Sequence, residues 1–194
     1  MPEQQYALVS RSTGSARSCA ILLLIGTLIS TSCSERYVRV DWESVEYTIA
    51  TEFPEISQIT TRNLSEIIAD SAKEVMLLDV REENEVAVSH LLGAVRVGSV
   101  QDAVVLVESA PHHTIIVAYC SVGYRSAEFV SHLKAITTRD VYNLEGSLFR
   151  WANEERPVYR GTERVTSVHP FNDRWGALLN SSLHAYEPVL STEH

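Results

Sequence analysis

Short apolar runs alternate with amphipathic segments through the middle of the chain, from residue 56 to residue 153. The apolar runs are too short for helices, and the almost continuous run at 75–80 is typical of a strand buried on both faces of a sheet. The segments between the runs repeat their apolar residues at helical spacing, as Leu64, Ile67 and Ile68 do. The pattern predicts strands at 56–60, 75–80, 94–97, 114–119 and 141–144 and helices at 63–70, 100–108, 126–136 and 147–153.

Strands that alternate with helices are typical of a parallel sheet, because each helix carries the chain back to the edge where the next strand begins. We therefore expect an α/β fold with a five-stranded parallel sheet and helices on both of its faces. Residues before 56 are mixed in polarity without a sustained period, so we interpret 33–55 as a tether. The domain itself is expected at 56–160, and a C-terminal extension at 161–194 is expected to pack on it.

The first 32 residues have the pattern of an export signal. Arg11 and Arg17 precede an apolar stretch at 19–29, and the small residues 30–32 lead into Cys33. The apolar stretch is shorter than the ~20 residues that span a bilayer. A cysteine directly after small residues resembles the lipobox of bacterial lipoproteins, so we expect a signal peptide at 1–32 and lipidation of Cys33. A plain secretory signal and an uncleaved anchor or wrongly assigned start are the alternatives.

Length and charge narrow the class of protein. The chain has 194 residues and a formal net charge of −9, which fits one globular domain with some chain left over at its ends. The basic residues are scattered and give no phosphate-binding surface, so nucleic acid is not an expected partner. With the signal removed and Cys33 lipidated, the protein would lie in the bacterial cell envelope, anchored to a membrane and facing the periplasm or the cell exterior.

Cys120 would then be the one thiol left in the exported chain. A lone cysteine is either a buried small apolar residue or a reactive centre. Cys120 follows the predicted strand at 114–119 and precedes the predicted helix at 126–136, and ligands gather at such carboxyl ends of parallel strands. Backbone N–H groups of the turn and the helix N-terminus stabilise an anion there. This position favours a reactive thiol that is partly thiolate near neutral pH.

The charged residues near this turn have two interpretations each. Arg125 either holds an anionic substrate or braces the loop by pairing with a carboxylate. Asp79 lies near the end of another predicted strand, at 75–80, and Arg81 follows it, so we expect both to face the same rim of the sheet. We interpret Asp79 as a structural ion pair or cap, whereas Arg81 stays undecided and is counted among the substrate-binding candidates. Ser126 is expected to cap the helix that follows.

Four segments, in order and at ordinary spacings, resemble the signature motifs of single-domain rhodaneses over about 56–158. They are 77–82 (LLDVRE), 89–94 (SHLLGA), 120–126 (CSVGYRS) and 142–151 (YNLEGSLFRW). The second segment has Ser89 and Leu92 where the family's G-H-I-P-G-A has glycine and proline. The fourth has Ser147 where a second glycine is common. These departures fall in turns that define the fold.

The resemblance implies a rhodanese-like fold and sulfur transfer. In rhodaneses the loop cysteine, here Cys120, takes the outer sulfur of a donor such as thiosulfate, becomes a persulfide, and passes the sulfur to a thiol or to cyanide. The substrate-binding residues of such a loop would be Ser121, Val122, Gly123, Tyr124 and Arg125. Their N–H groups favour the thiolate and the persulfide anion, and Gly123 permits a backbone conformation with positive φ.

Phosphatases and arsenate reductases of the same fold use a Cys-x5-Arg loop, which is wide enough for a tetrahedral oxyanion. The loop here is one residue shorter, from Cys120 to Arg125, so we expect it to admit a sulfur atom and to hold phosphate poorly. No cofactor or metal is expected. His112 and His113 precede the strand at 114–119 without further ligands at suitable spacing, and His90 is interpreted as hydrogen-bonded in its turn.

Two functions from different classes follow. The first is a transferase, a rhodanese-type sulfurtransferase that acts as a monomer with a small sulfur donor and a thiol or cyanide acceptor. The second is a non-catalytic rhodanese-fold module that binds a partner at the envelope. In the C-terminal extension, Phe171 and Trp175 are interpreted as apolar anchors of a cap, with a partner-docking surface as the alternative.

Overall fold

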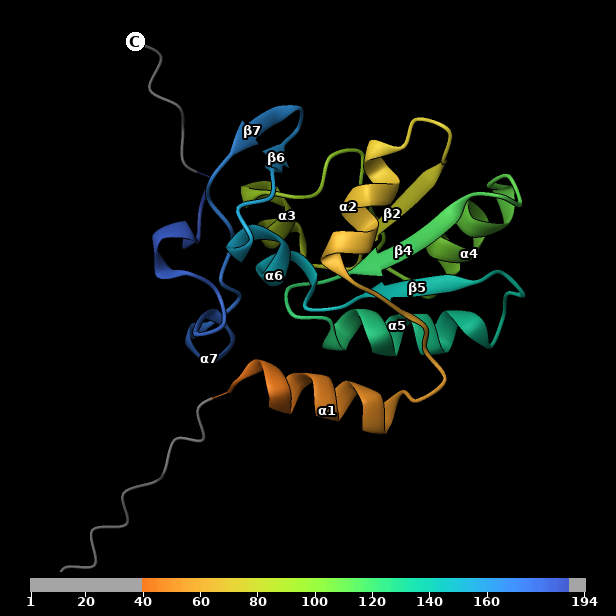
Figure 1. Ribbon diagram of the computed structural model, residues 1–194, viewed down its shortest axis with the longest axis horizontal. Coiled ribbons are helices and arrows are strands. Elements are labelled where there is room, and N and C mark those ends of the chain that lie inside the picture. Colours follow the sequence, from red (N-terminus) through yellow and green to blue (C-terminus); the bar gives the residue numbers. More distant parts are fainter. Residues whose placement is uncertain (1–39, 189–194) are drawn as a thin grey trace, which may run out of the picture. The chain divides into compact units, whose positions relative to one another are not determined.

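A five-stranded parallel sheet lies at the centre of the structure, a computed structural model in which residues 40–188 are described (Figure 1). Its strands are β1 (Gln58–Ile59), β2 (Val75–Asp79), β3 (Val95–Arg96), β4 (Ile115–Tyr119) and β5 (Val141–Leu144). Their order is β1-β5-β4-β2-β3, and every neighbouring pair is parallel. The predicted α/β class and parallel sheet are confirmed.

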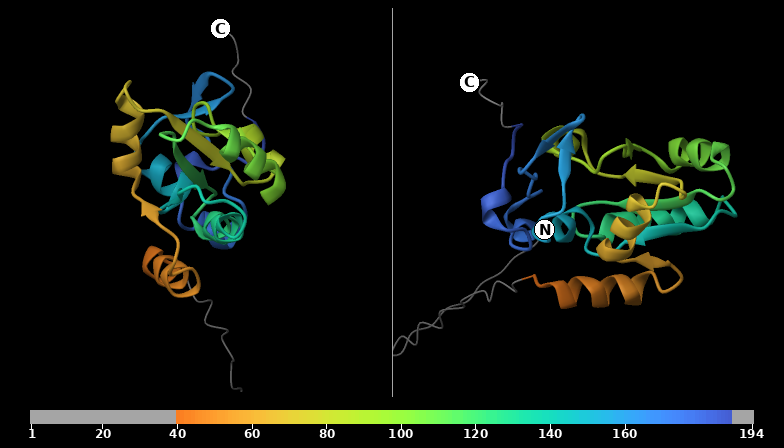
Figure 2. Two further views of the ribbon diagram at one scale, coloured as in Figure 1. Left: turned by 90° about the vertical axis from the view of Figure 1, so that its right-hand side faces the viewer. Right: turned by 45° about the horizontal axis from the view of Figure 1, so that its top comes forward.

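Helices cover both faces of the sheet. They are α1 (Trp42–Glu52), α2 (Thr61–Ala69), α3 (Glu83–Val88), α4 (Val100–Ser109), α5 (Tyr124–Lys134), α6 (Ser147–Asn153) and α7 (Asp173–Gly176). The left view of Figure 2 shows α2 and α4 on opposite sides of the strands. Helix α5 contacts α4 on the one face, and α2 contacts α6 on the other.

The central strand β4 divides the core into two apolar clusters. Ile116 and Ala118 pack with residues of α4 and α5, whereas Val117 and Tyr119 pack with residues of α1, α2 and α6. Alternate side chains of a strand point to opposite faces of a sheet, so a run that is apolar at every position is buried on both. This explains why the run at 114–119 carries no polar alternation.

Two predicted elements have the bounds that the sequence pattern gives, β5 and α6. The predicted cap of α5 is wrong. The helix begins at Tyr124 with Gly123 as its N-cap, and Ser126 lies inside the first turn, where its Oγ donates to the Gly123 carbonyl at 3.2 Å. Gly123 has φ +105°, and this left-handed turn starts the helix two residues before the predicted start.

Some elements are not predicted by the pattern. Helix α1 lies in the segment interpreted as a tether, and of its residues only Val45 and Ile49 are buried. Asp41 caps it, because the Asp41 Oδ1 accepts from the Ser44 N–H at 2.8 Å. The antiparallel strands β6 (Val158–Arg160) and β7 (Glu163–Val165) form a separate hairpin.

The chain after this hairpin returns across the carboxyl end of the sheet, toward which β4 and β5 point in Figure 1. Val168, Leu178 and Leu179 are buried in the cluster that includes Val117. The Val168 N–H donates to the Leu183 carbonyl at 2.7 Å, and the Asn153 side chain donates to the Leu178 carbonyl at 2.8 Å. These contacts fix the segment that carries α7 beside the end of β4.

The predicted signal peptide and Cys33 lie outside residues 40–188, so the predictions on export and lipidation are untested by the structure. Within the described part of the chain, no helix combines the length and apolar character needed to cross a bilayer.

Candidate functional site

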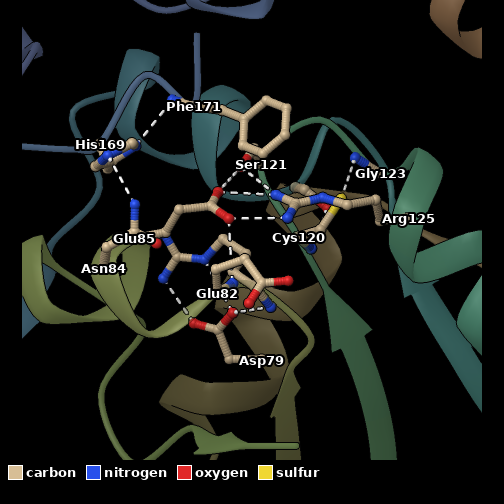
Figure 3. Close-up of polar contacts among 12 residues, drawn as sticks. Asp79, Glu82, Asn84, Glu85, Cys120, Ser121, Gly123, Arg125, His169 and Phe171 are labelled. Carbon is tan, nitrogen blue, oxygen red and sulfur yellow. Dashed lines mark hydrogen bonds and ion pairs between the residues drawn. The ribbon is translucent and has the colours of Figure 1, made fainter. Parts of the chain in front are cut away.

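Cys120 lies directly after β4, at the carboxyl end of the sheet, and lines a pocket of about 200 Å³. Its side chain is 1% exposed, and its Sγ accepts a hydrogen bond from the Gly123 N–H at 3.1 Å (Figure 3). The pocket is lined by Cys120, Ser121, Val122, Tyr124, Arg125, Phe171 and Trp175. The predicted loop residues are therefore brought together around one sulfur atom.

The backbone of Cys120 is held by the neighbouring motif at the start of α6. The Cys120 N–H donates to the Ser147 Oγ at 3.1 Å, and the Cys120 carbonyl accepts from the Leu148 N–H at 3.1 Å. The Ser121 carbonyl accepts from the Phe149 N–H at 2.9 Å. These bonds satisfy the loop's first backbone groups and hold Cys120 where its sulfur accepts from the Gly123 N–H.

Gly123 combines two roles in this loop, because it caps α5 in a left-handed conformation and donates its N–H to the sulfur. We expect Gly123→Ala to lower the free energy of unfolding by about 1–2 kcal/mol, the cost of left-handed backbone for a residue with a Cβ. The shifted N–H would stabilise the thiolate less, so alkylation of Cys120 by iodoacetamide at neutral pH should slow several-fold.

Gly161→Ala is the matched control for this variant. Gly161 has φ +59° in the turn between β6 and β7, and a Cβ there would meet no atom within 4 Å. It should lower stability by a similar amount and leave the alkylation rate of Cys120 unchanged. An unchanged alkylation rate in Gly123→Ala as well would show that the Gly123 N–H does not activate the thiol.

Arg125 is paired with a carboxylate. Its two terminal nitrogens contact the two oxygens of Glu85 at 2.8 Å each, and Nη2 also donates to the Ser121 Oγ at 3.0 Å. Burial alone would raise the pKa of Glu85, but the hydrogen bonds and charge of Arg125 outweigh burial and hold it below its usual value. Two roles were considered for Arg125, binding an anionic substrate and bracing the loop by pairing with a carboxylate. The structure shows the second of these roles.

Arg81 does not line the pocket. Its guanidinium is fully buried, where Nη2 contacts Asp79 Oδ2 at 2.6 Å and donates to the Ser89 carbonyl at 2.7 Å. Burial opposes its charge, but the charge and hydrogen bonds of Asp79 outweigh burial and raise the pKa of Arg81. The structural ion pair considered for Asp79 is thus formed with Arg81. This buried position gives no support to Arg81 as a substrate-binding residue.

The C-terminal extension contributes residues that sequence reasoning did not assign to the site. Phe171 is 38% exposed rather than a buried anchor, and its ring lies over the Arg125 guanidinium with 4.5 Å from Cζ to the ring centroid (Figure 3). Trp175 packs partly against the core and also lines the pocket. Both residues lie far from Cys120 in sequence, and no local pattern marks them.

His169 holds Phe171 in place. The Phe171 N–H donates to the His169 Nδ1 at 3.0 Å, and the backbone of Phe171 is left-handed, with φ +65°. Burial lowers the pKa of His169, which favours the neutral ring that accepts this bond. Left-handed backbone is uncommon for a residue with a side chain and collects at functional sites.

The three histidines considered from the sequence have structural or surface positions. The His90 Nε2 accepts from the Gly161 N–H at 3.1 Å, so His90 ties its turn to the hairpin of β6 and β7. His112 and His113 lie on the surface before β4, and His113 contacts Glu74 at 3.4 Å. Within residues 40–188 no three His, Cys, Asp or Glu side chains are grouped to hold a metal ion.

Comparison with known proteins points to one family. The model of the rhodanese-like domain matches residues 60–154, which include β2, β4 and the loop that holds Cys120. The chain is 31% identical over 105 residues to the putative sulfurtransferase YtwF of Bacillus subtilis, covering 53% of this chain and 97% of YtwF. It is also 31% identical over 102 residues to the probable adenylyltransferase/sulfurtransferase MoeZ of Mycobacterium tuberculosis, covering 52% of this chain.

The chain spans only 26% of MoeZ. The crystal structure of a thiosulfate sulfurtransferase from Pseudomonas aeruginosa has a similar fold, with a TM-score of 0.52 and 18% identity. That match covers 63% of this chain and 23% of the other. Because the chain covers nearly all of YtwF, and the family model falls on the sheet and on the Cys120 loop, this chain belongs to the rhodanese-like domain family.

Proposed function

We propose that this protein is a sulfurtransferase that forms a persulfide on Cys120 from thiosulfate or another sulfane-sulfur donor. The observation that carries the proposal is the place of Cys120, which lines a pocket and has its Sγ in reach of the Gly123 N–H at the start of α5. A helix N-terminus and backbone N–H groups stabilise an anion, which both the thiolate and the persulfide require.

The reaction consists of two displacements at sulfur. In the first, the Cys120 thiolate attacks the outer sulfur of the donor, and the inner group leaves with the electron pair of the broken S–S bond, as sulfite when thiosulfate is the donor. In the second, a thiolate or cyanide attacks the outer sulfur of the Cys120 persulfide. The Cys120 thiolate then leaves with the bonding pair, so each cycle returns the enzyme unchanged and needs no added oxidant or reductant.

The pairing of Arg125 with Glu85 holds the Cys120 loop in one conformation. Glu85 and Ser121 hold the guanidinium beside the loop, and the loop carbonyls are bonded to α6. The Gly123 N–H therefore already points toward the sulfur before a donor arrives. Donors placed in advance for a developing charge need no reorganisation when the reaction occurs.

The test is to incubate the full chain with thiosulfate, remove excess donor, and measure the mass of the peptide that contains Cys120. We expect a gain of one sulfur atom on Cys120, which cyanide removes with release of an equal amount of thiocyanate. A Cys120 mass that no sulfane-sulfur donor changes would contradict the proposal. It would favour the alternative, a non-catalytic binding module, for which Cys120 should also alkylate slowly at neutral pH.

We further propose that the protein is a lipoprotein of the cell envelope, anchored through Cys33. The support is the sequence of residues 1–33, in which basic, apolar and small residues precede a cysteine. The mass of the N-terminal peptide from membrane-extracted protein tests this, because lipidation adds a diacylglyceryl group to Cys33. An unmodified Cys33, or a mature N-terminus elsewhere, would contradict it.

A further inference from the structure

The pocket at Cys120 has mainly apolar walls, and two of them come from beyond the matched family region at 60–154. Phe171 and Trp175 belong to the C-terminal extension, and they face Val122 and Tyr124 of the loop. Binding pockets with aromatic and aliphatic walls favour ligands that bring apolar surface to them. The extension therefore adds apolar surface to the pocket in which a substrate would contact the Cys120 loop.

The charge in the pocket is already compensated. Arg125 is the charged side chain among the residues that line it, and both of its terminal nitrogens are bound to Glu85. The ring of Phe171 lies over one face of its guanidinium. A small dianion such as thiosulfate would lose water on entry and gain contacts with backbone N–H groups, but with no uncompensated cationic side chain.

The position of Phe171 is set by the structure around it. His169 accepts the Phe171 N–H and is itself buried, and the Asn84 Nδ2 lies 3.4 Å from the His169 Nε2. Val168 is bonded through both backbone groups, to Leu183 and to Ala185. The left-handed backbone of Phe171 is therefore maintained by its surroundings, as is usual where an unfavourable conformation serves a site.

A second pocket adjoins the Cys120 pocket. This second pocket, of about 350 Å³, shares Tyr124 and Trp175 with it and extends along α1, past Val45 and Thr48. A thiosulfate ion fills only a small part of this volume. A substrate whose reacting sulfur reaches Cys120 could lay an apolar body across the two shared rings.

We propose that Phe171, together with Trp175, forms a specificity subsite for organic sulfur compounds, namely persulfides or thiosulfonates in which the inner sulfur, bonded to the transferred sulfane sulfur, carries an apolar group. The proposal rests on the proposed sulfur-transfer function and names the class of donor. Phe171 contacts the apolar group and thereby favours it over inorganic thiosulfate. The transfer step is unchanged, because the Cys120 thiolate takes the outer sulfur and the organic sulfinate or thiolate leaves with the bonding pair.

The test compares two donors with the same reacting group, benzenethiosulfonate and methanethiosulfonate. We would measure kcat/KM for each in the wild type and in Phe171→Ala, so that their different intrinsic reactivities cancel in the ratio. Phe171→Ala should lower kcat/KM for benzenethiosulfonate by about tenfold, the effect of losing most of an aromatic contact, and change it little for methanethiosulfonate. Phe171→Leu should recover part of the loss.

Tyr47→Ala is the matched control, because Tyr47 is an exposed aromatic residue of α1 that lines neither pocket. It should leave both values of kcat/KM unchanged. A Phe171→Ala variant whose ratio equals that of the wild type would overturn the subsite while leaving sulfur transfer intact. If neither donor nor thiosulfate places sulfur on Cys120 in the wild type, the proposed function itself fails, and the subsite with it.

Discussion

Replacement of Cys120 by serine is expected to abolish thiocyanate formation from thiosulfate and cyanide, with a fall in rate of about a thousandfold or more. A serine hydroxyl keeps the shape of the pocket, but it is not ionised near neutral pH and forms no persulfide. The Gly123 N–H and the start of α5 would then have no anion to stabilise. The assay is thiocyanate release at saturating donor, with folding of the variant checked by circular dichroism.

Cys33→Ser is the matched control for this experiment. It removes a cysteine that the proposal places at the lipid anchor, so it should leave the turnover of the detergent-extracted protein unchanged. Cys120→Ala should behave as Cys120→Ser does. Full turnover in Cys120→Ser would mean that sulfur is carried by another group, and the assignment of the site would fall.

The largest expected effect on stability comes from Asp79→Ala. Asp79 and Arg81 form an ion pair in which both side chains are buried, and removal of Asp79 leaves the Arg81 guanidinium without its carboxylate. Uncompensated buried charges of this kind cost about 3–5 kcal/mol. Since whole domains are stable by only about 5–15 kcal/mol, the variant should unfold at much lower urea concentration or fail to fold at 37 °C.

Asp70→Ala provides the contrast, because Asp70 also pairs with a basic residue, Lys73 at 3.9 Å, but its side chain is 46% exposed. Exposed pairs contribute less than about 1 kcal/mol, so the urea midpoint of this variant should stay close to that of the wild type. The double variant Asp79→Leu with Arg81→Met should regain much of the lost stability, since apolar pairs replace buried ion pairs well. Equal, small effects of Asp79→Ala and Asp70→Ala would show that Asp79 is not the group that compensates Arg81.

The spacing of apolar residues predicts those helices and strands that bury a face along their whole length. Strand β5 and helix α6 have the predicted bounds because each is apolar along a whole face. Helix α1 escapes prediction because only Val45 and Ile49 are buried in it, one pair at i and i+4. Helix α3 is too short for a period to be visible, although it carries Glu85.

The site was predictable only as far as it is local. The loop from Cys120 to Arg125 is one continuous segment, so its motif and its place after a strand identify it. Glu85 and Phe171 reach Arg125 through tertiary packing, across 40 and 46 residues of chain respectively. Such contacts leave no trace in the spacing of residues along the sequence. For this reason the pairing of Arg125 with a carboxylate could be predicted as an alternative, but the identity of that carboxylate could not.

Two of the departures from the family motifs, Ser89 and Ser147, have physical explanations in the structure. Ser89 stands where glycine is common, but its φ is −169°, an extended conformation that any residue adopts. Ser147 has φ +49°, which explains the glycine usual at this position, and its hydroxyl bridges the Leu144 carbonyl and the Cys120 N–H. A motif comparison shows that Ser147 differs, and the structure shows what the added hydroxyl does.

The residues that line the Cys120 pocket come from two distant parts of the chain, the loop at 120–125 and the C-terminal extension. The loop residues come first, but the pocket is closed by Phe171 and Trp175, which follow Cys120 by about fifty residues of chain. A folding chain therefore carries a thiol without its aromatic walls until the C-terminal segment docks on the core through Leu178 and Leu179. The folding of the C-terminal segment thus determines when Cys120 becomes enclosed by aromatic side chains.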